Sequence, residues 1–285
     1  RLACGFIAAG IRPLDRVVVQ LPNIPEFVYT YFALARIGAI PVTALRAHRQ
    51  AEVRHFLRAS GAAAYLIPDV VGGFDFRVMA SEMQTEFPNL KHVLVAGEPA
   101  AGQLALSSLP AAPAPVAGPR PADVSTMLLS GGTTSLSKLI PRTHDDYVLN
   151  ARLCGAAAGF SERTVLMAIL PLGHNYNLAS PGMLGAFYFG GTVVIAQGAG
   201  VDDVFALVQR ERVTVIAAVV PLITTWLNSP ALAAYDHSSL EVVQNGGARL
   251  APELRRRLRQ QLGCTPQEIY GTAEGLINMT RLDDP

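Results

Sequence analysis

Short runs of β-branched and aliphatic residues alternate with helical patterns along most of the chain, and this alternation constrains the fold more than any other feature. In the first hundred residues such runs occur at Val17–Leu21, Ile40–Ala44, Ala63–Ile67 and His92–Ala96. Helical patterns occur at Leu2–Ala9, Pro25–Ile37 and Ala51–Ala59. Strands that are separated by helices are joined by crossovers, which build a largely parallel sheet covered by helices. We therefore predict an α/β fold of layered sheets and helices.

Residues 97–122 interrupt this alternation, because proline, alanine and glycine dominate there without a hydrophobic period. Such a segment is typical of a surface connector. Beyond it, strands are expected at Ser125–Leu129, Thr164–Ile169, Thr192–Ala196, Val213–Ala217, Leu240–Gln244 and Glu268–Tyr270. Helices are expected at Asp145–Ala157, Val201–Glu211, Pro221–Asn228 and Pro252–Leu262. The sequence therefore predicts two α/β subdomains, residues 1–122 and residues 123–285.

Composition limits which binding partners and which cellular compartment we expect for the protein. The net charge is +1, from 23 basic and 22 acidic residues, so we expect neither nucleic acid nor an anionic membrane as a partner. Cys4, Cys154 and Cys264 lie far apart, which argues against a disulfide framework or a zinc site. No apolar run approaches the roughly 18 residues of a membrane span. The N-terminus also lacks the layout of a signal peptide, so a cytoplasmic location is expected.

The most informative segment is Ser-Gly-Gly-Thr-Thr-Ser-Leu-Ser-Lys at residues 130–138, directly after an expected buried strand. Glycines let backbone N–H groups approach an oxyanion closely, hydroxyls add donors, and Lys138 adds a positive charge. A polyphosphate site and an ordinary polar turn both explain this composition. The segment is not an NTPase P-loop, because Ser137 precedes the lysine and Leu139 follows it. Gly198-Ala199-Gly200 is no dinucleotide fingerprint either, because the third glycine is missing.

A second segment, His174-Asn175-Tyr176, follows an expected strand and is followed by Ser180 and an apolar helical run. A short amide beside a flat ring suits a planar hydroxybenzoate. A turn histidine and a core tyrosine explain the same residues without a ligand. Both interpretations remain open from the residues alone.

A third segment combines paired glycines with an aromatic residue and a carboxylate. Gly246 and Gly247 lie at the end of an expected strand and make room for a flat ligand. Tyr270 can stack on a base, Thr272 can hydrogen-bond a phosphate, and the oxygens of Glu274 can bind Mg²⁺. A plain strand–turn–helix unit with a surface glutamate is the alternative.

The three segments, in this order, resemble the adenylate-forming enzymes, which include acyl-CoA synthetases, nonribosomal peptide adenylation domains and luciferases. The phosphate loop of that family reads Ser/Thr-Gly-Gly-Thr-Thr-Gly-x-Pro-Lys, and this chain departs from it at Ser135 and Ser137. His174-Asn175-Tyr176 and the run from Tyr270 to Leu282 are similar to the aryl-acid branch. The resemblance extends over residues 1–285 and implies the large N-terminal domain of that fold.

The resemblance implies ATP and Mg²⁺ as cofactors and an aryl acid as substrate. It implies catalytic roles for His174, Lys138 and Glu274, with Glu274 as the metal ligand. It implies nucleotide contacts from Ser130, Gly131, Gly132, Thr133, Thr134, Lys138, Gly247, Ala248, Tyr270, Gly271, Thr272 and Glu274. It implies acid contacts from Asn175, Tyr176, Ser180, Gly246, Gly247 and Ile277.

The implied reaction is attack of a carboxylate oxygen on the α-phosphorus of ATP, which releases pyrophosphate and leaves an aryl-AMP. The aryl group would then pass to the phosphopantetheine arm of an aryl carrier protein in siderophore synthesis. Residues 174–196 and 245–282 are similar to members that activate salicylate for mycobactin, whereas Ser180 favours 2,3-dihydroxybenzoate. An aryl- or acyl-CoA ligase and a non-catalytic nucleotide-binding module remain alternatives.

The family's small C-terminal domain, which supplies a bridging lysine, lies outside this sequence. By itself the chain is therefore expected to bind ligands and to adenylate poorly.

Overall fold

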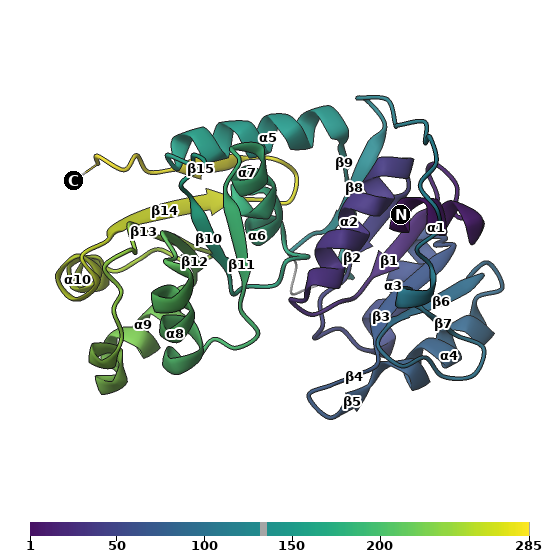
Figure 1. Cartoon of the computed structure of the whole chain (residues 1–285), viewed down its shortest axis with the longest axis horizontal. Coiled ribbons are helices and arrows are strands. Elements are labelled where there is room, and N and C mark those ends of the chain that lie inside the picture. The colour runs from purple at the N-terminus through teal and green to yellow at the C-terminus, as the bar shows by residue number, and fades with distance from the viewer. Residues whose placement is uncertain (132–135, 285) are drawn as a thin grey trace. The chain divides into compact units, whose positions relative to one another are not determined.

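The computed structural model describes residues 1–131 and 136–284 (Figure 1). These residues form two compact units, Arg1–Tyr147 and Val148–Pro285. Each unit contains a mainly parallel sheet with helices in its crossovers, so the predicted α/β class is confirmed. Within the described residues, no helix is both long and apolar enough to cross a bilayer.

The sheet of the first unit has seven strands in the order β7-β6-β3-β1-β2-β8-β9. Its strands are β1 (Arg16–Val19), β2 (Ile40–Thr43), β3 (Ala64–Pro68), β6 (His92–Ala96), β7 (Leu104–Ala105), β8 (Val124–Leu129) and β9 (Leu139–Thr143). All neighbours are parallel except β8 and β9, which form an antiparallel pair at one edge. A small hairpin joins β4 (Val70–Val71) to β5 (Phe74–Asp75). The edge strand β9 was not predicted from the sequence.

The helices of this unit are α1 (Leu2–Ala8), α2 (Pro25–Ile37), α3 (Gln50–Ser60) and α4 (Phe76–Glu86). Helix α2 has the bounds that the sequence predicts. It begins with proline, which needs no N–H partner there, and ends at Gly38 with φ of 70°. Helix α4 was missed, although Phe76, Met79, Ala80 and Met83 repeat at the spacing of one buried helical face.

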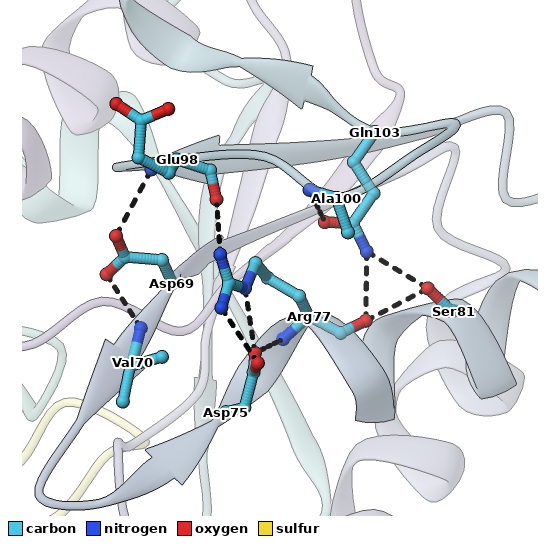
Figure 2. Close-up of polar contacts among 8 residues, drawn as sticks. All are labelled: Asp69, Val70, Asp75, Arg77, Ser81, Glu98, Ala100 and Gln103. Carbon is cyan, nitrogen blue, oxygen red and sulfur yellow. Dashed lines mark hydrogen bonds and ion pairs between the residues drawn. The ribbon is translucent and has the colours of Figure 1, made fainter.

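The predicted connector begins as an ordered segment tied to α4, as Figure 2 shows. Glu98 N donates to Asp69 (3.1 Å), and its carbonyl accepts from Arg77 Nη1 (3.0 Å). Gln103 Nε2 then donates to the Arg77 carbonyl (2.9 Å) and to Ser81 Oγ (3.1 Å). A short 3₁₀ helix follows at Leu106–Ser108, and residues 109–123 form neither helix nor strand.

The contacts divide the chain after Tyr147, later than the boundary proposed from composition at residues 122 and 123. Strand β8 follows the connector, yet it pairs with β2 of the first sheet, and β9 pairs with β8. These two strands therefore belong to the first unit by hydrogen bonding.

The sheet of the second unit has six strands in the order β11-β10-β12-β13-β14-β15, with only β14 and β15 antiparallel. Its strands are β10 (Val165–Ala168), β11 (Thr192–Ile195), β12 (Val215–Ala218), β13 (Val242–Gly246), β14 (Thr265–Gly271) and β15 (Ile277–Met279). The helices are α5 (His144–Ala157, which begins in the first unit), α6 (Asn175–Ala179), α7 (Gly182–Tyr188), α8 (Val201–Glu211), α9 (Val220–Asn228) and α10 (Pro252–Arg257). A π-helical turn, Leu258–Leu262, extends α10.

Both faces of this second sheet are buried. Val243 belongs to a large core with Phe205 and Trp226, which come from α8 and α9. Its neighbour Val242 belongs to a second cluster on the other face, with Phe160 and Ala186. Successive residues of a strand point to opposite faces, so β13 is covered on both sides and its carboxyl end is left for ligand chemistry.

Candidate active site

The predicted phosphate loop lies in the sequence between β8 and β9, and the structure describes its two ends, residues 130–131 and 136–138. Its neck is closed by two hydrogen bonds, from Ser130 N to the Lys138 carbonyl (3.0 Å) and from Lys138 N to Ser130 Oγ (2.9 Å). Gly131 and Lys138 are exposed. The predicted contacts of Gly132, Thr133 and Thr134 lie outside the described residues, as does the departure at Ser135.

His174 follows β10 and caps the short helix α6. Its Nδ1 accepts a hydrogen bond from Tyr176 N (3.2 Å). The proton of the neutral ring therefore lies on Nε2, which can donate to an oxyanion. Although part of the residue is exposed, desolvation by the surrounding atoms lowers the pKa of His174, which favours this neutral form.

Asn175 connects the second predicted segment to the third. The side chain is buried, and Nδ2 donates to the carbonyl oxygen of Thr272 (3.2 Å). Residues 97 positions apart are thereby joined at the carboxyl ends of their strands. The structure therefore brings the predicted acid-binding segment and the predicted nucleotide segment together within the second unit.

Tyr176 forms an apolar wall with residues from three strands. Its ring packs with Ile269 and Ile277, and also with Ala217. A Cβ on Gly246 would lie 2.8 Å from Tyr176 Cε1, so only glycine lets the ring approach this strand end. Burial raises the pKa of Tyr176 far above its ordinary value, and its hydroxyl stays protonated.

Ser180 lies one helical turn after Tyr176, so the two side chains share a face. It is 2% exposed, and within the described part of the chain its Oγ has no hydrogen-bond partner. A buried hydroxyl without a partner costs about 1–3 kcal/mol. A ligand hydroxyl that reaches this atom would recover that energy.

The glycine pair turns the chain sharply at the end of β13. Gly247 has φ of 81°, in the left-handed region that favours glycine. Asn245 Nδ2 donates to the Ala248 carbonyl (2.7 Å), and Leu250 N donates to Glu268 Oε2 (3.1 Å). Neither Asn245 nor Glu268 was predicted as a site residue.

Tyr270 ends the buried part of β14 and is 65% exposed, so its ring is available for stacking. The turn that follows is closed by Thr272 N, which donates to the Leu276 carbonyl (3.0 Å). Gly271 packs against Ile277, because a Cβ there would lie 2.5 Å from Ile277 Cδ1. Ile269 was not predicted as a wall residue. Because successive side chains of a strand point to opposite faces, an exposed Tyr270 predicts that its neighbour Ile269 lies on the buried face.

Glu274 lies in this turn with its carboxylate exposed. No cluster of three or more His, Cys, Asp or Glu side chains suited to a metal occurs among the residues that the structure describes. Mg²⁺ is commonly held by one or two carboxylates together with substrate phosphates and water. A single exposed carboxylate fits that mode of binding.

The described residues form a two-unit α/β protein in which polar and aromatic side chains of the predicted site gather at the carboxyl ends of the strands of the second sheet. A family model described as "AMP-binding enzyme" matches residues 1–285. The chain belongs to this family, so the predicted family is confirmed.

Named relatives point to aryl acids. The chain is 48% identical over 285 residues to the 2,3-dihydroxybenzoate-AMP ligase of Bacillus subtilis, covering 100% of this chain and 53% of that protein. It is 43% identical over 289 aligned residues to the salicyl-AMP ligase / salicyl-S-ArCP synthetase of Mycobacterium tuberculosis, covering 100% and 51%. The chain thus spans about half the length of the curated relatives that it matches.

A solved structure matches the whole chain as well. The apo structure of MbtA from Mycobacterium smegmatis superposes with a TM-score of 0.91 at 40% identity, covering 100% of this chain and 52% of that one. This likeness confirms the predicted adenylate-forming fold.

Proposed function

We propose that this chain binds ATP and an aryl acid in an aryl acid-AMP ligase, which makes an aryl-AMP and pyrophosphate. The observation that carries the proposal is the hydrogen bond from Asn175 to Thr272. It joins an aromatic-walled pocket to the segment that ends in Tyr270 and Glu274. The two named relatives, which are ligases of hydroxybenzoates, support the aryl acid as substrate.

In this reaction a carboxylate oxygen attacks the α-phosphorus, the bond to pyrophosphate breaks, and its electron pair leaves with pyrophosphate. No proton has to move, so the protein acts by orienting and by offsetting charge. Asn175 and the Nε2–H of His174 orient the carboxylate. Lys138 and the loop amides bind the β- and γ-phosphates.

The nucleotide base and the metal are assigned to the third segment. The exposed ring of Tyr270 stacks on adenine, beside Gly247 and Ala248. Glu274 would hold Mg²⁺, and the bound ion would neutralise negative charge on the phosphates. Gly271 and Thr272 lie between Tyr270 and Glu274 in the sequence and contact the α-phosphate.

We assign 2,3-dihydroxybenzoate as the preferred acid over salicylate. The flat ring lies against Tyr176 and Ile277, and Ser180 Oγ pairs with the 3-hydroxyl. Salicylate lacks that hydroxyl and would leave the buried Ser180 without a partner.

The acceptor of the aryl group is a carrier-protein thiol of a siderophore pathway. The thiol loses its proton to solvent, its sulfur attacks the acyl carbon, and a C–S bond forms while the acyl C–O bond to the phosphate breaks and AMP leaves with the electron pair. The relative named salicyl-S-ArCP synthetase supports a carrier protein, and coenzyme A is the alternative thiol.

ATP–pyrophosphate exchange by the full-length protein tests the proposal, with salicylate, 2,3-dihydroxybenzoate, benzoate and an aliphatic acid as substrates. We expect exchange with the hydroxybenzoates, fastest with 2,3-dihydroxybenzoate. Exchange with the aliphatic acid alone would overturn the aryl assignment. No exchange with any acid would favour a non-catalytic nucleotide-binding module. Adding carrier protein or coenzyme A separately then identifies the acceptor.

A further inference from the structure

Helix α3 packs against the neck of the phosphate loop. Its buried residues Val53, Phe56 and Leu57 belong to one hydrophobic cluster, against which Leu129 and Leu139 also pack. Leu129 and Leu139 are the paired residues of β8 and β9 that immediately flank the loop. Helix α3 is therefore a fixed support beside the loop, within the first unit.

One side chain of α3 is bonded to the loop itself. His55 Nε2 lies 2.8 Å from the carbonyl oxygen of Ser137, the residue before Lys138. A carbonyl oxygen can only accept, so Nε2 carries the proton and donates it. The half-buried ring also meets Phe56 edge-on, with ring centroids 5.8 Å apart. The imidazole is thus held on one side by the core and bonded on the other side to the loop.

This contact restrains the backbone immediately before the lysine. Lys138 is exposed, and its charge sits at the end of a flexible four-carbon stem. The two hydrogen bonds between Ser130 and Lys138 restrain the backbone of Lys138 and leave its side chain unrestrained. The Ser137 carbonyl and Lys138 N belong to one peptide group, so the bond from His55 adds a restraint from outside the hairpin to the backbone that carries the lysine side chain.

We propose that His55 is a positioning residue of the phosphate loop, which holds Ser137 and so places Lys138 for the triphosphate of ATP. The inference rests on the proposed function, since it requires that Lys138 binds ATP. His55 acts through the loop, whereas the residues that we assign to the aryl acid belong to the second unit. Its loss should therefore weaken the use of ATP selectively.

Two substitutions separate the hydrogen bond from the packing. His55→Phe keeps a flat ring and removes the donor, whereas His55→Gln offers an N–H donor of similar reach. In ATP–pyrophosphate exchange by the full-length protein, we expect His55→Phe to raise the KM for ATP roughly three- to tenfold. The KM for the aryl acid and the melting temperature should stay unchanged, and His55→Gln should recover most of the loss.

Arg58→Gln is the matched control, because Arg58 lies on the same helix, and its exposed side chain contacts Glu86 and the Phe87 ring, away from the loop. Its KM for ATP should equal that of the wild type. Equal rises in both KM values for His55→Phe, or a His55→Gln variant as impaired as His55→Phe, would overturn the inference. In that case, ATP–pyrophosphate exchange by the wild-type protein would still support the proposed function. A wild-type protein that exchanges with no acid would overturn both.

Discussion

Each unit of the molecule ends its parallel sheet with one antiparallel edge strand, and in each unit a predicted nucleotide segment is the turn before that strand. In the first unit the turn lies between β8 and β9 and contains Lys138; in the second it lies between β14 and β15 and contains Glu274. Both turns are closed at the base by backbone hydrogen bonds. The two turns differ in which residue outside the hairpin is hydrogen-bonded to them.

The turn of the second unit is bonded to the residue that we assign to the aryl acid, because Asn175 donates to Thr272. The turn of the first unit is bonded instead to a helix, through His55 and Ser137. A substitution in the second turn should therefore affect acid and nucleotide together. A substitution in the first should affect the nucleotide alone.

The largest effect is expected for Lys138→Ala in the first turn. Loss of a positive charge that stabilises the phosphates should lower kcat/KM for ATP by about 10²–10³-fold. ATP–pyrophosphate exchange measures it, with Lys138→Arg as the control that keeps the charge. If the alanine variant retained the full wild-type value, Lys138 would have no role in catalysis.

Asn175 bonds to the second turn from helix α6, and Asn175→Ala should raise the KM for the aryl acid by about 10–100-fold, since it removes a buried polar partner worth about 1.5–3 kcal/mol. The KM for ATP should rise less, because the Thr272 carbonyl loses only one donor. Exchange kinetics with each substrate varied in turn give both values. A larger change for ATP than for the acid would contradict the role of Asn175.

Tyr270→Ala should raise the KM for ATP about tenfold, since stacking of a base on an aromatic ring contributes about 1–3 kcal/mol. Tyr270→Phe keeps the ring and should behave like the wild type. Tyr270 lies on β14, before the turn, so the KM for the acid should stay unchanged and serves as the internal control. An unchanged KM for ATP in the alanine variant would place adenine elsewhere.

Ser180→Ala sharpens the description of the acid pocket. It should lower kcat/KM for 2,3-dihydroxybenzoate about three- to tenfold, by removing one hydrogen bond. Activity with salicylate should be unchanged or slightly higher, because the variant removes an unpaired buried hydroxyl. A parallel loss with both acids would show that Ser180 does not read the 3-hydroxyl.

The smallest effect concerns pH and the second unit alone. The pKa of His174 is lowered from its ordinary 6.5, so the unfolded chain binds a proton first as the pH falls. Stability from this group is complete above about pH 6.5 and decreases below it; because the residue is exposed, solvent screening keeps the slope well below the one-proton limit of about 1.4 kcal/mol per pH unit. Trp226, the one tryptophan of the chain, is buried in this unit, and its fluorescence reports urea unfolding there.

His174→Asn provides the control for that measurement, because asparagine also caps a helix and does not titrate. Its unfolding midpoint should depend less on pH between 7.5 and 5.5. The same slope in both proteins would mean that His174 does not contribute.

Local signals in the sequence predicted most of the elements, because strands and helices bury faces at fixed periods. The bounds of α2, α8 and β6 agree with the expected ranges, and other elements differ by a few residues at their ends. The antiparallel strands β9 and β15 were not predicted. None of their hydrophobic residues is fully buried, so hydrophobic patterns mark them weakly, and their pairing depends on a partner strand.

The motifs by themselves predicted which residue types would serve phosphate, aryl acid and adenine, because those chemistries need glycine, amide, aromatic and charged groups in short runs. Only the tertiary structure decided that Asn175 meets Thr272, that Gly246 makes room for Tyr176, and that His55 reaches Ser137. The physical reason is that each of these contacts joins residues remote in the chain. They lie side by side only after crossovers bring strand ends and helices together, and no local pattern encodes that meeting.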